Sequence, residues 1–334
     1  MTAPHGLHAG PAGRAEARLL AIHPDSGEAY VTGFDRLAAL LDPGDLLVVN
    51  DAATLPASFA GTLGGETVEV RLASAEPWRA VVFGRGDWRQ RTEDRPDPPT
   101  IETGDEIVFD GIVASVTHVM CRRLVTLEFD RDGDDLWAAL YAAGRPVQYS
   151  YLARDLRLAD VQTPYGARPW AVEMPSAGRP LGVGALIALR RRGVDVRALT
   201  HAAGLSATGD HALDRALPFP ERYEIPAPTW EAARAARRVV AVGTSVARAL
   251  ESAARTGVLA GTTELVLDRG VPLRLTRGLL SGIHAPGESH WRVLRAFAGD
   301  EVLARAASTA AREGLFVHEF GDASLILAAP GRPR

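Results

Sequence analysis

Polar residues follow three predicted strands, at 46–49, 194–200 and 239–242. They are Asn50, Asp51, His201, Gly243 and Thr244. In an open α/β sheet the ligand crevice lies beyond the carboxyl ends of the strands. If the three strands are parallel neighbours, these polar groups converge on one crevice. Each of them alone also fits an ordinary turn at the end of a strand.

Gly243 and Thr244 open a predicted helix over 245–255, so the free N–H groups of its first turn would face an anion. Thr244, Arg248 and Glu251 follow the spacing i, i+4, i+7 and share one face of that helix. A hydroxyl, a guanidinium and a carboxylate on one stripe could hold a zwitterion such as an amino-acid moiety. The same spacing also fits a helix cap followed by a surface Arg–Glu pair of little energetic value.

His284 and His290 lie in a Gly- and Pro-containing segment, 282–290, ahead of further predicted helix. Histidine can transfer protons near neutral pH, although a histidine in a loop is often only solvated. The sequence has no zinc-binding HExxH spacing, no GxGxxG fingerprint, no Walker A motif and no GxSxG elbow. We therefore expect no metal site, and these residues alone leave the ligand of the crevice open.

The composition is that of a globular protein of about two domains, with 334 residues, 46% hydrophobic and 23% charged. A net charge of −4 argues against binding to nucleic acid through bulk charge, although not against a local basic patch. The single cysteine, Cys121, excludes an internal disulfide. Without an apolar leader or an 18-residue apolar run, we expect a cytoplasmic protein without membrane spans.

The elements that must position these residues fall into two classes. Residues 57–130 contain short alternating β segments separated by Gly-rich turns, which favours a small barrel or sandwich. The flanking regions alternate strands with helices, the predicted helices being 34–41, 181–192, 229–238 with Thr229 as its N-cap, 245–255 and 290–313. We predict an α/β domain built from 14–56 and 134–330, an inserted barrel-like domain over 57–133, and a flexible N-terminus, 1–13.

Four stretches, 43–51 (PGDLLVVND), 239–254 (VVAVGTSVARALESAA), 278–301 and 320–327 (FGDASLIL), occur in a characteristic order. The stretch with Glu221, Tyr223, Ile225 and Pro226 lies between the first two. Together they resemble the S-adenosylmethionine:tRNA ribosyltransferase-isomerases of queuosine biosynthesis. The resemblance covers most of the chain, with weak matching inside 60–170, and implies an α/β domain with an inserted β-barrel.

Members of that family transfer and isomerise the ribosyl part of S-adenosylmethionine. The acceptor is a 7-aminomethyl-7-deazaguanine base at the wobble position of tRNA, adenine and methionine are released, and no metal is required. The resemblance therefore implies S-adenosylmethionine as co-substrate and tRNA as partner. We expect a monomer.

The resemblance also gives roles to the candidate residues. Gly243, Thr244 and Arg248 would hold the methionine carboxylate, and Glu251 would meet the ammonium. The candidates for proton transfer are His201, His284 and Glu221. The remaining binding residues would be Asn50 or Asp51 for the ribose hydroxyls or the base, with Ser176 and Tyr223.

The chain departs from the family pattern where basic or aromatic groups are expected. The family's Pro-Thr-Ala-Gly-Leu-His-Phe segment is PSAGRPL at 175–181, without its histidine. Two alternatives stay open: a relative using S-adenosylmethionine with a small-molecule acceptor or none, and a non-catalytic nucleoside- or RNA-binding paralogue. A basic stripe from 190–192 and 234–238 to the crevice would favour tRNA. A crevice blocked by Arg179, Pro180 or Trp291 would favour the non-catalytic protein.

Overall fold

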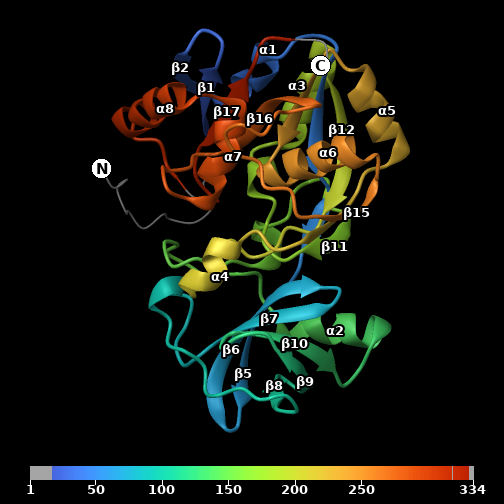
Figure 1. Ribbon diagram of the computed structural model, residues 1–334, viewed down its shortest axis with the longest axis vertical. Coiled ribbons are helices and arrows are strands. Elements are labelled where there is room, and N and C mark those ends of the chain that lie inside the picture. The colour runs from blue at the N-terminus through green and yellow to red at the C-terminus, as the bar shows by residue number, and fades with distance from the viewer. Residues whose placement is uncertain (1–16, 318, 331–334) are drawn as a thin grey trace.

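A computed structural model describes residues 17–317 and 319–330, and the N-terminus expected to be flexible, 1–13, lies outside this part of the chain. Within the described part, a nine-stranded sheet and a closed six-stranded barrel form two bodies, one above the other in Figure 1. Along the sheet the strands are β15 (Ala260–Thr263), β13 (Glu221–Glu224), β12 (Asp195–His201), β3 (Asp45–Asn50), β14 (Arg238–Val242), β16 (Thr276–Gly282), β17 (Ala323–Leu327), β1 (Arg18–His23) and β2 (Glu28–Gly33).

The centre of the sheet is parallel. β3 pairs with β12 on one side and with β14 on the other, in registers that place Leu199 opposite Asn50 and Ala241 opposite Val48. Every residue of β3 and of β14 is buried, as continuous apolar runs predict for strands covered on both faces. The three strands that end in polar residues are therefore parallel neighbours, and their carboxyl ends meet at one edge.

Helices cover both faces of the sheet. One face carries α5 (Ala227–Ala235), α6 (Thr244–Thr256), α7 (Ser289–Phe297) and α8 (Asp300–Arg312), and the other carries α1 (Leu37–Leu40) and α3 (Val183–Arg192). The long helix predicted over 290–313 is two helices, because the chain is extended at Ala298 and Gly299. The helix predicted over 34–41 is a 3-10 turn, Phe34–Arg36, followed by the single turn α1.

The predicted N-cap role of Thr229 is wrong. α5 begins at Ala227 after Pro226, so Thr229 lies within its first turn. The Thr229 hydroxyl donates instead to the carbonyl of Ala198 at 2.8 Å, and this bond ties the helix to β12. Pro228, in the first turn of the helix, favours the start that the threonine was expected to supply.

The barrel is made of β5 (Ser58–Leu63), β6 (Glu66–Ala75), β7 (Trp78–Phe83), β8 (Glu106–Phe109), β9 (Ile112–Val119) and β10 (Leu124–Phe129). Alternate residues of β8 and β9 point inward, and Phe59, Phe83 and Phe109 are fully buried. α2 (Gly133–Ala143) packs against the same core. The predicted fold, an α/β domain with a small inserted barrel, is confirmed.

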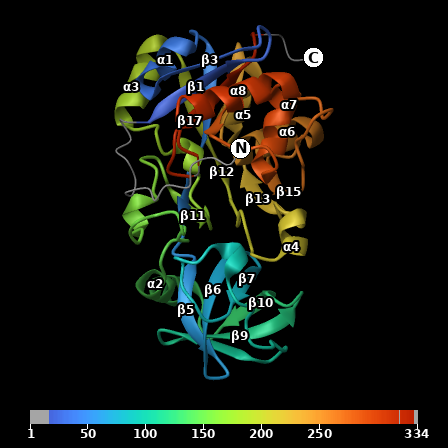
Figure 2. The ribbon, with the colours of Figure 1, turned by 90° about the vertical axis from the view of Figure 1, so that its left-hand side faces the viewer.

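The barrel lies beyond the carboxyl edge of the sheet. The chain leaves β3 at Asn50, passes through β4 (Ala52–Thr54) and enters the barrel at Ser58. β4 pairs with β11 (Arg168–Ala171), and both views place β11 and the short α4 (His211–Ala216) between the two bodies (Figures 1 and 2). Among the described residues, no helix combines the length and apolar character needed to cross a membrane.

Candidate functional site

A cavity of about 400 Å³ opens at the carboxyl edge of the sheet. It lies where β14 passes into α6, next to the end of β16 and the segments 173–177, 203–206 and 281–284. The predicted site residues that line it are Ser176, Glu221, Gly243, Thr244, Arg248 and His284. The predicted crevice therefore exists, and its lining brings these six residues together.

The start of α6 forms one wall of the cavity. Gly243 has φ 97° and ψ 151°, a conformation that essentially only glycine adopts, and no side chain caps the helix. The N–H of Gly243 donates to the carbonyl of Leu280 at 2.8 Å, which fixes the turn against β16. The N–H groups of the following turn have no partner within the helix, and Thr244 and Ser245 line the cavity. Together with the helix dipole, this wall favours an anion.

Arg248 and Glu221 form a buried ion pair on the cavity wall. A guanidinium N–H of Arg248 donates to Oε2 of Glu221, and its Nε donates to the carbonyl of Leu265 at 2.8 Å. Oε1 of Glu221 accepts the N–H of Gly204 at 2.8 Å. The side chains are 4% and 10% exposed, so each charge is matched inside the protein and neither is left to solvent.

His201 lies behind this pair rather than in the cavity. Its side chain is fully buried at the end of β12, and Nε2 is 3.5 Å from Oε2 of Glu221. Neither ring nitrogen makes a hydrogen bond. Burial lowers the pKa of His201 to about 4, and the carboxylate of Glu221 opposes this only in part, so the ring is neutral near pH 7. His201, a predicted candidate for proton transfer, is thus not among the residues that line the cavity, and its ring lies next to Glu221.

His284 reaches the cavity with its ring. Its Nε2 lies 2.9 Å from the hydroxyl of Ser281, and its Nδ1 lies 3.7 Å from Oε2 of Glu288. The ring stacks on that of His290 with centroids 4.8 Å apart and planes 14° apart. Burial lowers the pKa of His290 to about 4, and His284 adds to this effect. The polar partners and the stacked ring hold His284 in a defined orientation.

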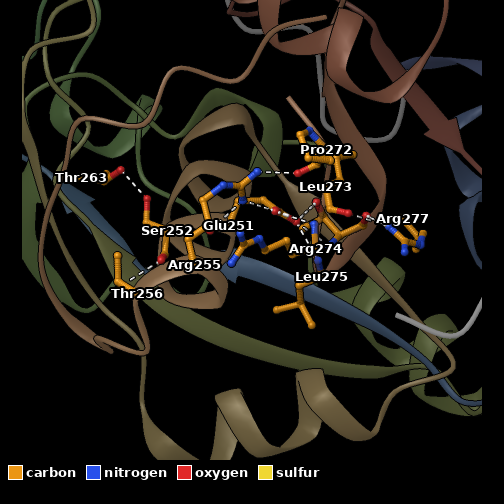
Figure 3. Close-up of polar contacts among 11 residues, drawn as sticks. Glu251, Ser252, Arg255, Thr256, Thr263, Pro272, Leu273, Arg274, Leu275 and Arg277 are labelled. Atoms are coloured by element: carbon orange, nitrogen blue, oxygen red, sulfur yellow. Dashed lines mark hydrogen bonds and ion pairs between the residues drawn. The ribbon is translucent and has the colours of Figure 1, made fainter. Parts of the chain in front are cut away.

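Glu251 does not share the cavity with Thr244 and Arg248, and the prediction that it does is wrong. Its carboxylate is fully buried and ties α6 to the segment before β16 (Figure 3). It accepts backbone N–H groups of Arg274, Leu275 and Thr276 at 2.8–2.9 Å, the Thr276 hydroxyl at 2.8 Å and Arg255 Nη1 at 2.5 Å. Burial alone would raise the pKa of Glu251, but these hydrogen bonds outweigh it and keep the carboxylate ionised.

Asn50, Asp51 and Tyr223 also lie outside the cavity lining. Asn50 donates from Nδ2 to the carbonyl of His201 at 2.9 Å and accepts its N–H at 2.9 Å. Asp51 accepts the hydroxyl of Thr200 at 2.6 Å, and the hydroxyl of Tyr223 donates to a backbone carbonyl of residue 258 at 2.8 Å. These strand ends converge as predicted, but their polar groups bond to one another and to backbone, so the predicted contacts to a ligand are not supported.

Sequence reasoning missed three carboxylates of the cavity wall, Glu173, Glu288 and Glu319. Glu288 precedes α7, and Glu173 and Glu319 lie in irregular segments without a helical spacing, so no sequence signal points to these two. Among residues 17–317 and 319–330, no three His, Cys, Asp or Glu side chains form a cluster that could hold a metal ion.

The basic clusters at 190–192 and 234–238 lie at the far edge of the sheet. The first ends α3 and precedes β12, and the second ends α5 and begins β14, so both meet the amino ends of the parallel strands. Arg237 and Arg238 are paired with Asp42. No basic stripe therefore runs from these clusters to the cavity within the described chain. Of the described cavity-lining residues, none is Arg179, Pro180 or Trp291, so these residues do not block it.

Comparisons with known proteins all point to one family, and each match covers nearly the whole length of this chain. A family model described as "Queuosine biosynthesis protein" matches residues 4–326. An S-adenosylmethionine:tRNA ribosyltransferase-isomerase of Anaeromyxobacter dehalogenans is 35% identical over 330 residues, 94% of this chain and 93% of the relative. The protein of that name from Solibacter usitatus is 32% identical over 336 residues, 95% of this chain and 94% of the relative.

Among solved structures, an S-adenosylmethionine tRNA ribosyltransferase from Thermotoga maritima has a similar fold, with a TM-score of 0.55 and 22% sequence identity. The superposition covers 98% of this chain and 99% of that one. The fold is therefore shared over nearly the whole chain.

Proposed function

Because this chain belongs to the family of queuosine biosynthesis proteins, we propose that it is an S-adenosylmethionine:tRNA ribosyltransferase-isomerase. The observation that carries the proposal is the match of relatives with that name over 94–95% of the chain at 32–35% identity. The reaction would transfer and isomerise the ribosyl part of S-adenosylmethionine onto a 7-aminomethyl-7-deazaguanine base in tRNA, releasing adenine and methionine.

The wall at the start of α6 suits the carboxylate of the methionine part. The free N–H groups after Gly243 and the hydroxyl of Thr244 would donate to it, and Arg248 would supply the opposite charge. Glu221 pairs with Arg248 on the cavity wall, so a bound carboxylate would compete with Glu221 for the guanidinium. Ser176 lines the same cavity and adds a hydroxyl for the rest of the donor.

Proton transfer falls to His284 and Glu221, the predicted candidates that reach the cavity. The sulfonium makes the adjacent C5′ protons acidic, so one positioned base can begin the reaction, and a proton donor can assist the departing adenine. His284, with its ring fixed by Ser281, is the proposed proton-transfer residue. His201 then acts as a positioning residue that supports Glu221 from behind.

The small-molecule and non-catalytic alternatives gain no support from these matches. They are separated from the main proposal by incubating the protein with S-adenosylmethionine and tRNA carrying 7-aminomethyl-7-deazaguanine, while adenine and methionine are assayed. Matched reactions contain tRNA with guanine at the same position, or no tRNA. Release that requires the modified tRNA, with a corresponding mass gain of that nucleoside, supports the proposal. Release without tRNA, or none at all, contradicts it.

Arg248 provides a test of the binding arrangement. Arg248→Gln removes a charge-assisted contact, so we expect kcat/KM for S-adenosylmethionine to fall by about 10- to 100-fold. Arg234→Gln is the matched control, because Arg234 is exposed near the opposite edge of the sheet and its loss should leave the rate unchanged. An unchanged kcat/KM in Arg248→Gln would remove Arg248 from the proposed site.

A further inference from the structure

Two carboxylates of the cavity wall, Glu173 and Glu319, have no part in the proposed reaction. They come from distant parts of the chain, Glu173 from the segment before the 3-10 helix Ser176–Gly178 and Glu319 from the segment before β17. In the described part of the chain, no arginine or histidine forms an ion pair with either of them. Within residues 17–317 and 319–330, the cavity therefore contains two acidic groups that no basic side chain pairs directly.

Glu173 is the more deeply placed of the two. Its residue is only 9% exposed, and the one described donor to its carboxylate is Ser206, whose N–H lies 3.0 Å from Oε1. Burial raises the pKa of Glu173 to about 7, and the nearby charge of Glu319 adds to this effect. The hydrogen bonds from Ser206 and the charge of Arg71 lower this pKa but do not outweigh burial. A carboxylate in this environment gains stability when a cation approaches it.

Glu319 is held in place by aromatic side chains. Its Oε2 accepts the hydroxyl of Tyr151, and the Tyr151 ring stacks on Tyr149 with centroids 5.5 Å apart. Tyr149 in turn meets the ring of Phe320 edge to face at 6.1 Å. This packing fixes one carboxylate, while burial fixes the other, so both are positioned before a ligand arrives.

We propose that Glu173 and Glu319 form a subsite for a compact organic cation, either a sulfonium or a primary ammonium. A cation between the two carboxylates relieves their mutual repulsion, whereas the cavity's own cation, Arg248, is already paired with Glu221. The start of α6, in the same cavity, suits an anion, so the cavity as a whole matches a ligand with both charges. The subsite rests on the proposed function, whose donor carries a sulfonium and an ammonium and whose acceptor base carries an aminomethyl group.

Binding of two matched pairs of compounds tests this subsite by calorimetry. S-adenosylmethionine and S-adenosylhomocysteine differ by the sulfonium charge, and free 7-aminomethyl- and 7-cyano-7-deazaguanine differ by the ammonium. In Glu173→Gln and Glu319→Gln we expect about a tenfold loss of affinity for the cationic member of one pair and little change for its neutral partner. The affected pair identifies whether the subsite takes the sulfonium or the ammonium.

Glu224→Gln is the matched control, because Glu224 pairs with Arg168 on the partly exposed strand β13 and does not line the cavity. Equal losses for the two S-adenosyl compounds alone would place their shared amino-acid ammonium on the subsite. Equal losses for all four compounds, or no loss in either variant, would overturn the subsite. If the variants bind all compounds as the wild type does and release adenine normally, the subsite fails and the proposed function stands. If the wild type releases no adenine with the modified tRNA, the proposed function fails, and the subsite, which rests on it, fails with it.

The melting temperature separates this subsite from a structural role. Glu173→Gln removes an uncompensated buried charge but keeps an oxygen for Ser206, so the empty variant should melt at a higher temperature than the wild type. A variant that loses cation affinity while gaining stability supports the subsite. A variant whose cation affinity and melting temperature both fall would show that Glu173 has only a structural role.

Discussion

At the residue scale, Glu251 is a charged side chain whose hydrogen-bonding capacity is used inside the protein and not for a ligand. Its two oxygens accept five hydrogen bonds inside the protein, four of them from the segment 274–276. Replacing such a group leaves these donors without partners in a buried place. We expect Glu251→Ala to lower the free energy of unfolding by about 3–5 kcal/mol.

Urea denaturation measures this loss, and calorimetry on the folded fraction measures the affinity for S-adenosylmethionine. Because Glu251 does not line the cavity, the affinity of the folded fraction should stay within about twofold of the wild-type value. Glu251→Gln, with the same shape, should fall between the wild type and Glu251→Ala in stability. A stable variant without affinity would instead place Glu251 in the binding machinery.

Glu173 makes a second residue-scale prediction, on the pH dependence of stability. Burial and Glu319 raise its pKa from 4.5 to about 7 in the folded protein. Between these pH values the folded state keeps a proton that the unfolded chain has lost, so this stabilising contribution falls as the pH rises and is gone above about pH 7. The other groups that influence the Glu173 carboxyl are Ser206 and Arg71, and both favour its charged form.

The comparison of wild type with Glu173→Gln at pH 5 and pH 8 isolates this contribution. The glutamine cannot titrate. The increase in the free energy of unfolding that Glu173→Gln produces should therefore be larger at pH 8 than at pH 5, by roughly 1–3 kcal/mol. Urea midpoints at the two pH values give the difference. The same gain at both pH values would mean that Glu173 titrates alike in the folded and unfolded states.

At the scale of elements, the start of α6 depends on one backbone conformation. Gly243 has φ 97°, and a Cβ there would lie 3.6 Å from that of Ala177, so the conformation rather than a clash restricts this position. Gly243→Ala should cost about 1–3 kcal/mol of stability and should also weaken binding of S-adenosylmethionine, because the first-turn N–H groups would shift. Thermal melts and calorimetry measure the two effects.

Gly257, at the other end of the same helix, provides the control. It has φ 75°, and a Cβ there would meet nothing within 4 Å. Gly257→Ala should therefore cost about 1 kcal/mol of stability while leaving the affinity unchanged. If both variants lose stability and neither loses affinity, the start of α6 is not an anion site.

The central strands can be predicted from the sequence because strands buried on both faces consist of continuous apolar residues. The strands at 46–49 and 239–242 and the helix after Gly243 were predicted within two residues of their observed bounds. The two short strands at one end of the sheet, β15 at the edge and β13 next to it, escaped prediction. ERYE and AGTT combine polar and small residues and gain their strand form from antiparallel pairing.

The candidate site was predictable only where the signal is local. Gly243, Thr244 and Arg248 belong to one helix start, and its spacing places them together. The side chain of Asn50 bonds to the backbone of His201, 151 positions away in the sequence. Residue spacing does not reveal such a tertiary contact. Neither residue lines the cavity.

At the scale of the whole molecule, the cavity and the exposed arginine clusters lie at opposite edges of the sheet. Arg190, Arg191 and Arg234 lie near the amino ends of the parallel strands. The triple change of these residues to Gln should leave tRNA-dependent kcat/KM within about twofold of the wild type, because salt screens surface charges beyond roughly 10 Å. Adenine release at two salt concentrations is the measurement. A fall of about tenfold, steeper at low salt, would place tRNA on that edge.

Arg248 on the cavity wall is already paired with Glu221. Adenosine and other nucleosides without an amino-acid tail carry no anion that could replace Glu221 in this pair. They gain nothing from Arg248, whereas a molecule bearing a carboxylate offers the guanidinium a rival partner. Under the proposed binding arrangement, the ion pair between Arg248 and Glu221 would thus disfavour nucleosides without a carboxylate, because only an anion can displace Glu221 from the guanidinium.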